Sequence, residues 1–442
     1  MAAIDCCCLK DKYVNLVKSE LAPALGCTEP VAVALCAAGA AAHIDGTPDD
    51  ITMYVSQYIM KNGMNVGVPN TDMVGLEIAT AMGVISSSPE KDLLVLNGMS
   101  AEDFAKAKEL LALHKVHVKL ANNNYKVYIE AVCTKGSNTA RAVIRDIHNQ
   151  FVYIEKNGEE LLNILPQCDE KAKQGARPED ECCLTVKKIY DEVVNNMSLE
   201  DLTFLREAVD VNKSIALEGL NHDYGHMVGK SILSNVEAGI IADDIANYAV
   251  ALTAAAADAR MAGCRKPVMT AVGSGNQGIT ATVPVIAVAD RLKVDEEKKL
   301  KALAMSLLVT IHTKHNLGRL SVLCGCGIAA AIGSCAGIIY LFGGNEENIE
   351  LGIQTMVADI SGMVCDGAKP GCAIKIATAV SATMRSALLA IHGVGANRYD
   401  GIVAPSVEDT LQNLASLGNE GMAGTNAAIL DMMIHKEKES SD

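Results

Sequence analysis

Hydrophobic residues recur at helical spacing along most of this 442-residue chain, and they alternate with polar residues in one interval. The helical period covers 12–25 and 31–43, and it returns in most segments from residue 184 onward. Between these parts lie runs rich in tyrosine and β-branched residues, a composition typical of strands. The predicted strands are 49–60, 116–120, 125–133 and 151–156. A charged amphipathic helix is predicted among them, over 101–115.

This change of period predicts the domain organisation. The expected fold class is α+β, with a mostly helical domain formed by 1–45 plus 184–442. A smaller α+β domain, 46–183, is inserted into it. The stretch 169–181 is charged and contains glycine and proline, so it is the predicted linker.

Composition narrows the class of protein. Half of the residues are apolar, but tryptophan is absent and phenylalanine is scarce, so the core must be built from Ala, Leu, Ile, Val and Met. A net charge of −15 without any basic run argues against nucleic acid as a partner. Residues 320–345 carry no charge and are long enough to span a membrane. They are rich in Gly, Ala, Ser and Cys and lack an aromatic belt, so we expect a buried core helix and no membrane.

Fifteen cysteines are the most informative part of the composition. No secretory signal is visible at the start of the chain, so we expect a cytoplasmic protein in which disulfides are not favoured. Metal binding, catalysis or apolar packing remain as roles. Cys324, Cys326 and Cys335 lie in one apolar segment, and Cys365 and Cys372 bracket the turn sequence DGAKPG. Thiols spaced in this way can converge on an iron–sulfur centre.

Cys27 is the one cysteine whose local sequence predicts reactivity. It precedes Thr28, the expected N-cap of a helix, with Glu29 and Pro30 in the first turn. A helix N-terminus favours the thiolate form of cysteine. A buried packing cysteine is the alternative.

Two further stretches are candidates for ligand binding. Residues 61–75 are rich in Gly and Asn and are interpreted either as a loop that lines a site or as a solvent loop. GSGNQG, 273–278, matches the dinucleotide fingerprint G-x-G-x-x-G. Pro284 and the helical pattern that follows weaken that interpretation. The same loop can hold a small carboxylate on its backbone N–H groups, with Ser274 and Asn276 as further donors, or it is purely structural.

Six motifs together resemble the L-cysteine desulfidase family, which is related to the α part of the iron–sulfur L-serine dehydratases. The motifs are GCTEP, KNGMNVGVPNTDMVGL, DARMAG, SGSGNQGITATVP, GRLSVLCGCGIAAAIG and ISGMVCDGAKPGCAIKIATA, and they extend over about 10–430. The resemblance implies a 4Fe–4S cluster on Cys324, Cys365 and Cys372, with one iron left for substrate. It leaves open whether Cys324 or Cys326 is the first ligand. It also implies that Cys27 is the catalytic base in cysteine catabolism, a β-elimination of L-cysteine to pyruvate, ammonia and hydrogen sulfide.

From the motifs and the resemblance we expect a lyase that acts on a small amino acid. The expected substrate-binding residues are Thr28, Glu29, Asn62, Ser274, Asn276 and Arg319. L-serine is the close alternative substrate, by the same mechanism. An NAD-binding oxidoreductase that uses GSGNQG and a non-enzymatic metal-binding protein are the rival classes. The resemblance is consistent with a homodimer, and it assigns no role to Cys6, Cys7, Cys8, Cys182 and Cys183.

Overall fold

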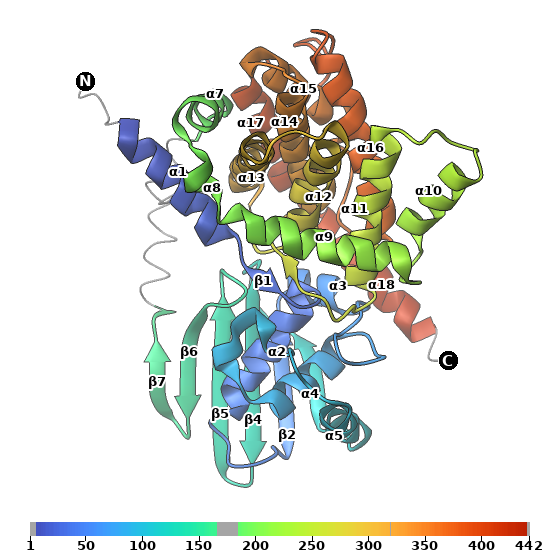
Figure 1. Cartoon of the computed structure of the whole chain (residues 1–442). Helices are drawn as coiled ribbons and strands as arrows, with labels where there is room; N and C mark the ends of the chain where they lie inside the picture. The colour runs from blue at the N-terminus through green and yellow to red at the C-terminus, as the bar shows by residue number, and fades with distance from the viewer. Residues whose placement is uncertain (1–5, 166–183, 319, 440–442) are drawn as a thin grey trace, which may run out of the picture.

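The computed structural model describes residues 6–165, 184–318 and 320–439, and it confirms an α+β fold dominated by helices (Figure 1). The predicted linker 169–181 and the candidate Arg319 lie outside the described residues. A sheet with its covering helices forms one part of the molecule, and a larger bundle of helices forms the other (Figure 1).

The sheet has six strands in the order β3-β2-β4-β5-β6-β7. Strands β2 and β3 are parallel, and the remaining neighbours are antiparallel. The strands are β2 (Asp50–Val55), β3 (Val116–Leu120), β4 (Tyr128–Lys135), β5 (Asn138–Arg145), β6 (Phe151–Lys156) and β7 (Glu159–Asn163). Burial alternates along β2 and along most of β4, as expected for strands with one face on a core.

Three helices cover one face of the sheet: α2 (Thr28–Ala41), α4 (Leu76–Ser86) and α5 (Ala101–Ala112). Helix α2 is buried along its whole length, and its apolar side chains share one hydrophobic cluster with the sheet and α4. The domain boundary at 45/46 stays a prediction, but the packing groups α2 with the sheet and not with the helical bundle.

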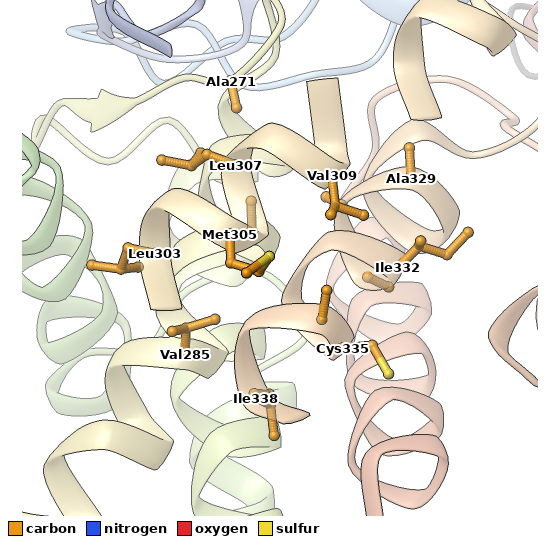
Figure 2. Packing of buried hydrophobic residues seen from close by; sticks show 14 of the residues in the cluster. Ala271, Val285, Leu303, Met305, Leu307, Val309, Ala329, Ile332, Cys335 and Ile338 are labelled. Atoms are coloured by element: carbon orange, nitrogen blue, oxygen red, sulfur yellow. The ribbon is translucent and has the colours of Figure 1, made fainter. Parts of the chain in front are cut away.

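The larger part consists of helices that pack on one central group. The central helices are α11 (Ile245–Met261), α12 (Gly275–Leu292), α13 (Glu296–Leu317), α14 (Ala331–Leu341) and α16 (Cys372–Ala390). Those around them include α1 (Cys6–Glu20), α7 (Val186–Asp191), α8 (Leu199–Leu202), α9 (Leu205–Asn221), α10 (Val228–Glu237), α15 (Glu346–Ile360), α17 (Val407–Ser416) and α18 (Thr425–Glu439). Their shared core is built from Ala, Leu, Ile, Val and Met side chains, as the composition predicted (Figure 2).

Close packing in this core depends on small residues. A Cβ on Gly333 of α14 would lie 2.0 Å from Oγ1 of Thr310 and 2.3 Å from the carbonyl of Ser306, both on α13. Helices α13 and α14 therefore approach as closely as they do because α14 has no side chain at this point. Cys335 lies in the same core and is completely buried (Figure 2), so it has the packing role expected of an isolated cysteine.

Most of the uncharged segment 320–345 is buried in this core, as expected, and its end at Gly343 and Asn345 is exposed. Among the described helices, only α16 is long and apolar enough to cross a membrane, a test that core helices also pass. In the molecule, 56% of that window is buried against other residues.

Several local predictions need correction. The strand predicted over 49–60 ends at Val55, and its second half is α3 (Gln57–Gly63), because the hydroxyl of Ser56 accepts from the N–H of Ile59 and starts a helix. Strands β5 and β7 and helix α4 were not predicted. Cys27, rather than Thr28, is the N-cap of α2, although its side chain makes no capping hydrogen bond.

Several contacts join the parts, two of them between elements of secondary structure. Strand β1 (Pro23–Ala24), between α1 and α2, pairs antiparallel with β8 (Val268–Met269) of the helical part. Helix α18 packs against α3 of the smaller part. These contacts place the start of α2 and the end of α3 opposite the helical core, where the candidate site lies.

Candidate active site

A single cavity collects the candidate residues from both parts of the molecule. Its lining includes Cys27, Glu29, Asn62, Ser274, Asn276, Cys324, Cys326, Cys365 and Cys372, all named from the sequence. It also includes residues that were not predicted, among them His148, Arg260, Gln277, Lys314 and Lys375. Thr28 is buried but does not line the cavity, so the structure does not bring it together with the others.

A short antiparallel contact places two of the cysteines next to each other. The N–H of Cys324 donates to the carbonyl of Met363 at 2.9 Å, and the N–H of Cys365 donates to the carbonyl of Val322 at 2.7 Å. Cys324 then starts a short π-helical turn, η4 (Gly325–Ala330), and its Sγ accepts from the N–H of Gly327 at 3.4 Å. The side chains of Cys324 and Cys365 therefore enter the cavity from paired segments.

The loop between Cys365 and Cys372 turns back as its composition predicted, and Cys372 is the first residue of α16. Gly367 in this loop has φ +95°, and a Cβ there would lie 2.3 Å from the carbonyl oxygen of Lys61. Only glycine fits this approach. The amino group of Lys61, which is completely buried, donates to the carbonyl of Cys365 at 2.8 Å. Helix α3 of the smaller part thus holds the cysteine loop in place.

The two neighbouring thiols Cys324 and Cys326 are distinguished by their surroundings. Their sulfur atoms are 3.5 Å apart. The hydrogen bond with Cys326 is the largest cause that lowers the pKa of Cys324 to about 7, whereas the same contact and burial raise the pKa of Cys326. The amino group of Lys375 adds positive charge beside Cys324 and donates to the carbonyl of Val364 at 3.0 Å.

The chemistry of these residues decides whether they suit the iron–sulfur cluster that the motifs imply. Among the described residues, no three His, Cys, Asp or Glu side chains lie close enough to hold a single metal ion. A cubane cluster is larger than a single ion, so its cysteine ligands lie further apart. The thiols of Cys324, Cys365 and Cys372 line one cavity, as such a cluster requires. Burial raises the pKa of Cys365 and Cys372, but a coordinating metal deprotonates a thiol by its own charge. Lys375 lies near Cys324 and Lys61 near Cys365, and their positive charges balance the negative charge of the thiolates. This donor set therefore fits such a cluster.

Cys27 is far from these cysteines in the sequence but lines the same cavity. Its thiol donates to the carboxylate of Glu29, with 3.3 Å between Sγ and Oε2. Burial, followed by the negative charge of Glu29, raises the pKa of Cys27 well above its usual range. The prediction of a thiolate was therefore wrong for this arrangement, because burial and the adjacent carboxylate outweigh the effect of the helix N-terminus.

Glu29 is held in its charged form. Burial alone would raise its pKa, but the positive charge of His148 and the hydrogen bond from Asn62 outweigh burial, and the net pKa is lowered. The amide of Asn62 donates to Oε1 of Glu29 at 2.8 Å. Cys27 therefore has a carboxylate beside it that can accept its proton.

The start of α12 also lines the cavity, beside the cysteine segments and the start of α2. Ser274 is its N-cap, without a side-chain capping hydrogen bond, and Asn276 and Gln277 follow in the first turn. Nη1 of Arg260, from α11, donates to Oδ1 of Asn276 at 2.9 Å. The dinucleotide interpretation of this loop lacks its fold: β8 is two residues long and pairs antiparallel with β1, and α12 leads into another helix, α13. Pro284 lies inside α12.

The residues that the sequence did not reveal are of common types in apolar or loop segments. His148 lies in the β5–β6 connection and is buried, and Arg260 lies at the end of a helix rich in alanine. Two signals were available for Arg260: it lies in the DARMAG motif, and it is a charged residue within an otherwise apolar helical run. His312, on α13, does not line the cavity and pairs with Glu408, with 2.6 Å between Nε2 and Oε2.

Comparison with known proteins identifies the family of the chain. Residues 90–431 match the family model described as serine dehydratase alpha chain. A relative from Oleidesulfovibrio alaskensis, called UPF0597 protein, is 44% identical over 426 residues, which cover 96% of this chain and 98% of the relative. A UPF0597 protein of Alkaliphilus oremlandii is 42% identical to this chain over 428 residues, which cover 96% of this chain and 98% of the relative. A UPF0597 protein of Bacteroides fragilis is 39% identical over 428 residues, which cover 97% of this chain and 98% of the relative.

The chain therefore belongs to the serine dehydratase alpha chain family, and this places it among the serine dehydratase-like lyases. The relationship to that family, which the six motifs predicted, is confirmed.

Proposed function

We propose that this protein is a 4Fe–4S-dependent lyase that converts L-cysteine to pyruvate, ammonia and hydrogen sulfide by β-elimination. The observation that carries the proposal is the convergence of four cysteines from three distant segments on one cavity: Cys27, Cys324, and the pair Cys365 and Cys372. A Cys–carboxylate pair faces the three other thiols there, which is the arrangement that proton abstraction beside a Lewis acid requires.

In this proposal Cys324, Cys365 and Cys372 hold the cluster. When bound, a cluster with three protein ligands supplies an open iron that polarises the substrate as a Lewis acid. The neighbouring Lys61 and Lys375 support the ligand loop, through the hydrogen bonds to the carbonyls of Cys365 and Val364.

Cys27 and Glu29 move the α-proton. Glu29 takes the proton of the Cys27 thiol along their existing hydrogen bond, and the resulting thiolate takes the proton from Cα of the substrate. The Cβ–S bond then breaks, and sulfide leaves with the bonding electron pair. The remaining 2-aminoacrylate reacts with water to form pyruvate and ammonia, so the atoms balance without an oxidant or a reductant.

The start of α12 orients the amino acid. The first N–H groups of a helix point outward without helical partners and favour an anion. Ser274 and Asn276 stand at this helix start and line the cavity, so they suit the carboxylate end of the substrate. Asn62 acts indirectly, because its amide holds Glu29.

L-serine is the second candidate substrate. The match to the serine dehydratase alpha chain favours it, since elimination of water from L-serine requires the same proton transfer and yields the same pyruvate and ammonia. A cytoplasmic location suits either reaction because thiols remain reduced there. We also propose that the partner is a small amino acid and not nucleic acid or membrane, and that the enzyme is a homodimer.

Anaerobic turnover tests the proposal. The purified protein is incubated with L-cysteine or L-serine, and pyruvate and sulfide are measured, together with absorbance near 400 nm. The variant Cys27→Ala is compared with Cys264→Ala, a buried cysteine that does not line the cavity. We expect pyruvate from wild type and the control, and a loss of at least about 100-fold in Cys27→Ala. Full activity in Cys27→Ala would remove this residue from the mechanism, and pyruvate formation from neither substrate would refute the lyase assignment.

A further inference from the structure

The guanidinium of Arg260 lies in the wall of the cavity. Arg260 is 2% exposed, yet no carboxylate of a described residue forms an ion pair with it. Its Nε has no hydrogen-bond partner. Nη1 makes only neutral contacts, with Oδ1 of Asn276 at 2.9 Å and Sδ of Met261 at 3.7 Å. A buried cation without an anion is costly, so its retention in a ligand cavity points to an anionic ligand.

The position of the guanidinium also favours an anionic ligand. A Cβ on Gly275 would lie 2.3 Å from Nε and 2.6 Å from Cζ of Arg260, so the guanidinium lies directly against the first residue of α12. That 18-residue helix has no side-chain cap on its N-terminal N–H groups. A helix N-terminus and a planar guanidinium thus adjoin the same space, and together they match the charge and geometry of a carboxylate.

A second unpaired group completes the arrangement. Oε1 of Gln277, in the first turn of α12, is buried without a hydrogen-bond partner, and its amide nitrogen donates to the carbonyl of Ala271 at 3.4 Å. An unpaired acceptor suits a cation such as an ammonium group. A Cβ on Gly325 would lie 2.8 Å from this oxygen, so Oε1 stands next to the segment that carries Cys324. The cavity therefore offers an anion site and, beside it, an acceptor on the side of the cysteines.

We infer that Arg260 binds the α-carboxylate of the substrate and that Oε1 of Gln277 accepts from its α-ammonium group. This deepens the proposed function and rests on it, because it assigns the two charged ends of an amino acid. Arg260 is then the residue that selects α-amino acids over amines and amides. Its charge also lies near Cys27, so a purely electrostatic effect on that thiol is the competing explanation.

Binding without turnover separates the two explanations. L-alanine has no leaving group, so its affinity for the anaerobically prepared enzyme can be measured by calorimetry, with L-alaninamide as the ligand that lacks the carboxylate charge. We expect wild type to prefer L-alanine, and we expect Arg260→Gln to bind it roughly 10- to 100-fold more weakly, with little change for L-alaninamide. The matched control is Arg265→Gln, an exposed arginine five residues further along, which should behave as wild type.

Two further variants keep the test decisive if Arg260→Gln folds poorly. Arg260→Lys preserves the charge but not the planar fork, so it should recover only part of the affinity for L-alanine. Gly275→Ala preserves the arginine but places a methyl group against Nε, and it should weaken L-alanine binding in the same direction. For turnover, Arg260→Lys should show a raised KM with a smaller change in kcat.

The outcomes are distinguishable from those of the proposed function. Unchanged affinity for L-alanine in Arg260→Gln, or full recovery by Arg260→Lys, overturns the inference even if wild type produces pyruvate. The absence of L-alanine binding to wild type also overturns it. Conversely, if wild type turns over neither L-cysteine nor L-serine but still loses L-alanine affinity in Arg260→Gln, the carboxylate site stands and the lyase proposal fails.

Discussion

The thiol of Cys27 donates a hydrogen bond to the carboxylate of Glu29, two residues further along the start of the same helix. Both residues are buried in the cavity that Cys324, Cys365 and Cys372 also line. The carboxylate raises the pKa of the thiol and is itself kept charged by His148 and Asn62. The pair is thus a thiol with its own proton acceptor, and its chemistry can be tested by changing either the carboxylate or the groups that keep it charged.

Replacement of Glu29 by Gln removes the proton acceptor and the negative charge while preserving the shape of the side chain. We expect kcat to fall by about 100-fold or more. Because the charge of Glu29 raises the pKa of Cys27, we also expect that pKa to fall in Glu29→Gln. Alkylation of Cys27, followed by peptide mass spectrometry across a pH series, should then begin at a lower pH than in wild type. Glu237→Gln, at an exposed position, is the control. An unchanged alkylation profile would contradict the prediction.

His148→Gln tests the charge that keeps Glu29 ionised. The positive charge of His148 lowers the pKa of Glu29, so its removal should raise that pKa. A protonated Glu29 cannot accept from Cys27, and the acidic limb of the activity profile should therefore shift to higher pH. The pH dependence of kcat is the measurement, with His435→Gln, an exposed histidine on α18, as the control. An acidic limb at the wild-type position would show that His148 does not act on Glu29.

Two serine variants distinguish the neighbouring thiols Cys324 and Cys326. Cys324 has the lowered pKa and its Sγ accepts from a backbone N–H, whereas the pKa of Cys326 is raised by the contact with Cys324 and by burial. We expect Cys324→Ser to lose most of its bound iron and sulfide and Cys326→Ser to retain it. Iron and acid-labile sulfide, assayed anaerobically, give the answer. Retention in Cys324→Ser with loss in Cys326→Ser would reverse the assignment.

Two glycines of one loop provide a matched pair. Gly367 has φ +95° and would place a Cβ 2.3 Å from the carbonyl of Lys61, whereas a Cβ on Gly371 meets open space. We expect Gly367→Ala to displace the loop and to lose its 400 nm absorbance in air several times faster than wild type, because the positive φ and the contact both oppose alanine. Gly371→Ala should bleach at the wild-type rate. Equal bleaching of the two variants would show that the contact with Lys61 does not hold the loop.

Much of the architecture could be predicted from local patterns. The long helices of the larger part follow the 3.6-residue period, and β3, β4 and β6 follow the alternation of β-branched residues and tyrosine. The prediction failed where a short element depends on its neighbours. β5 reads NTARAVIR and is a strand because β4 and β6 flank it. α3 starts within an apparent strand because Ser56 caps it.

The candidate site shows the same limit. Motifs identified Cys27, Glu29, Asn62, Ser274, Asn276 and the cysteines, and the cavity brings these residues together. Thr28 is adjacent in sequence but does not line the cavity, and Arg319 lies outside the described residues. His148 lies in none of the motifs. Arg260 and Gln277 lie in DARMAG and GSGNQG, but the local sequence does not show which side chains of a motif line the cavity.

The order of residues by itself determined most of the long helices, which thiols are candidates for ligation, and which family the chain belongs to, since these depend on local periodicity and motifs. Only the tertiary structure decided the protonation of Cys27 and the unpaired state of Nε of Arg260. A pKa and an unsatisfied hydrogen bond depend on burial and on charges contributed by segments far apart along the chain. Both properties arise only when the two parts of the molecule pack together and form the cavity.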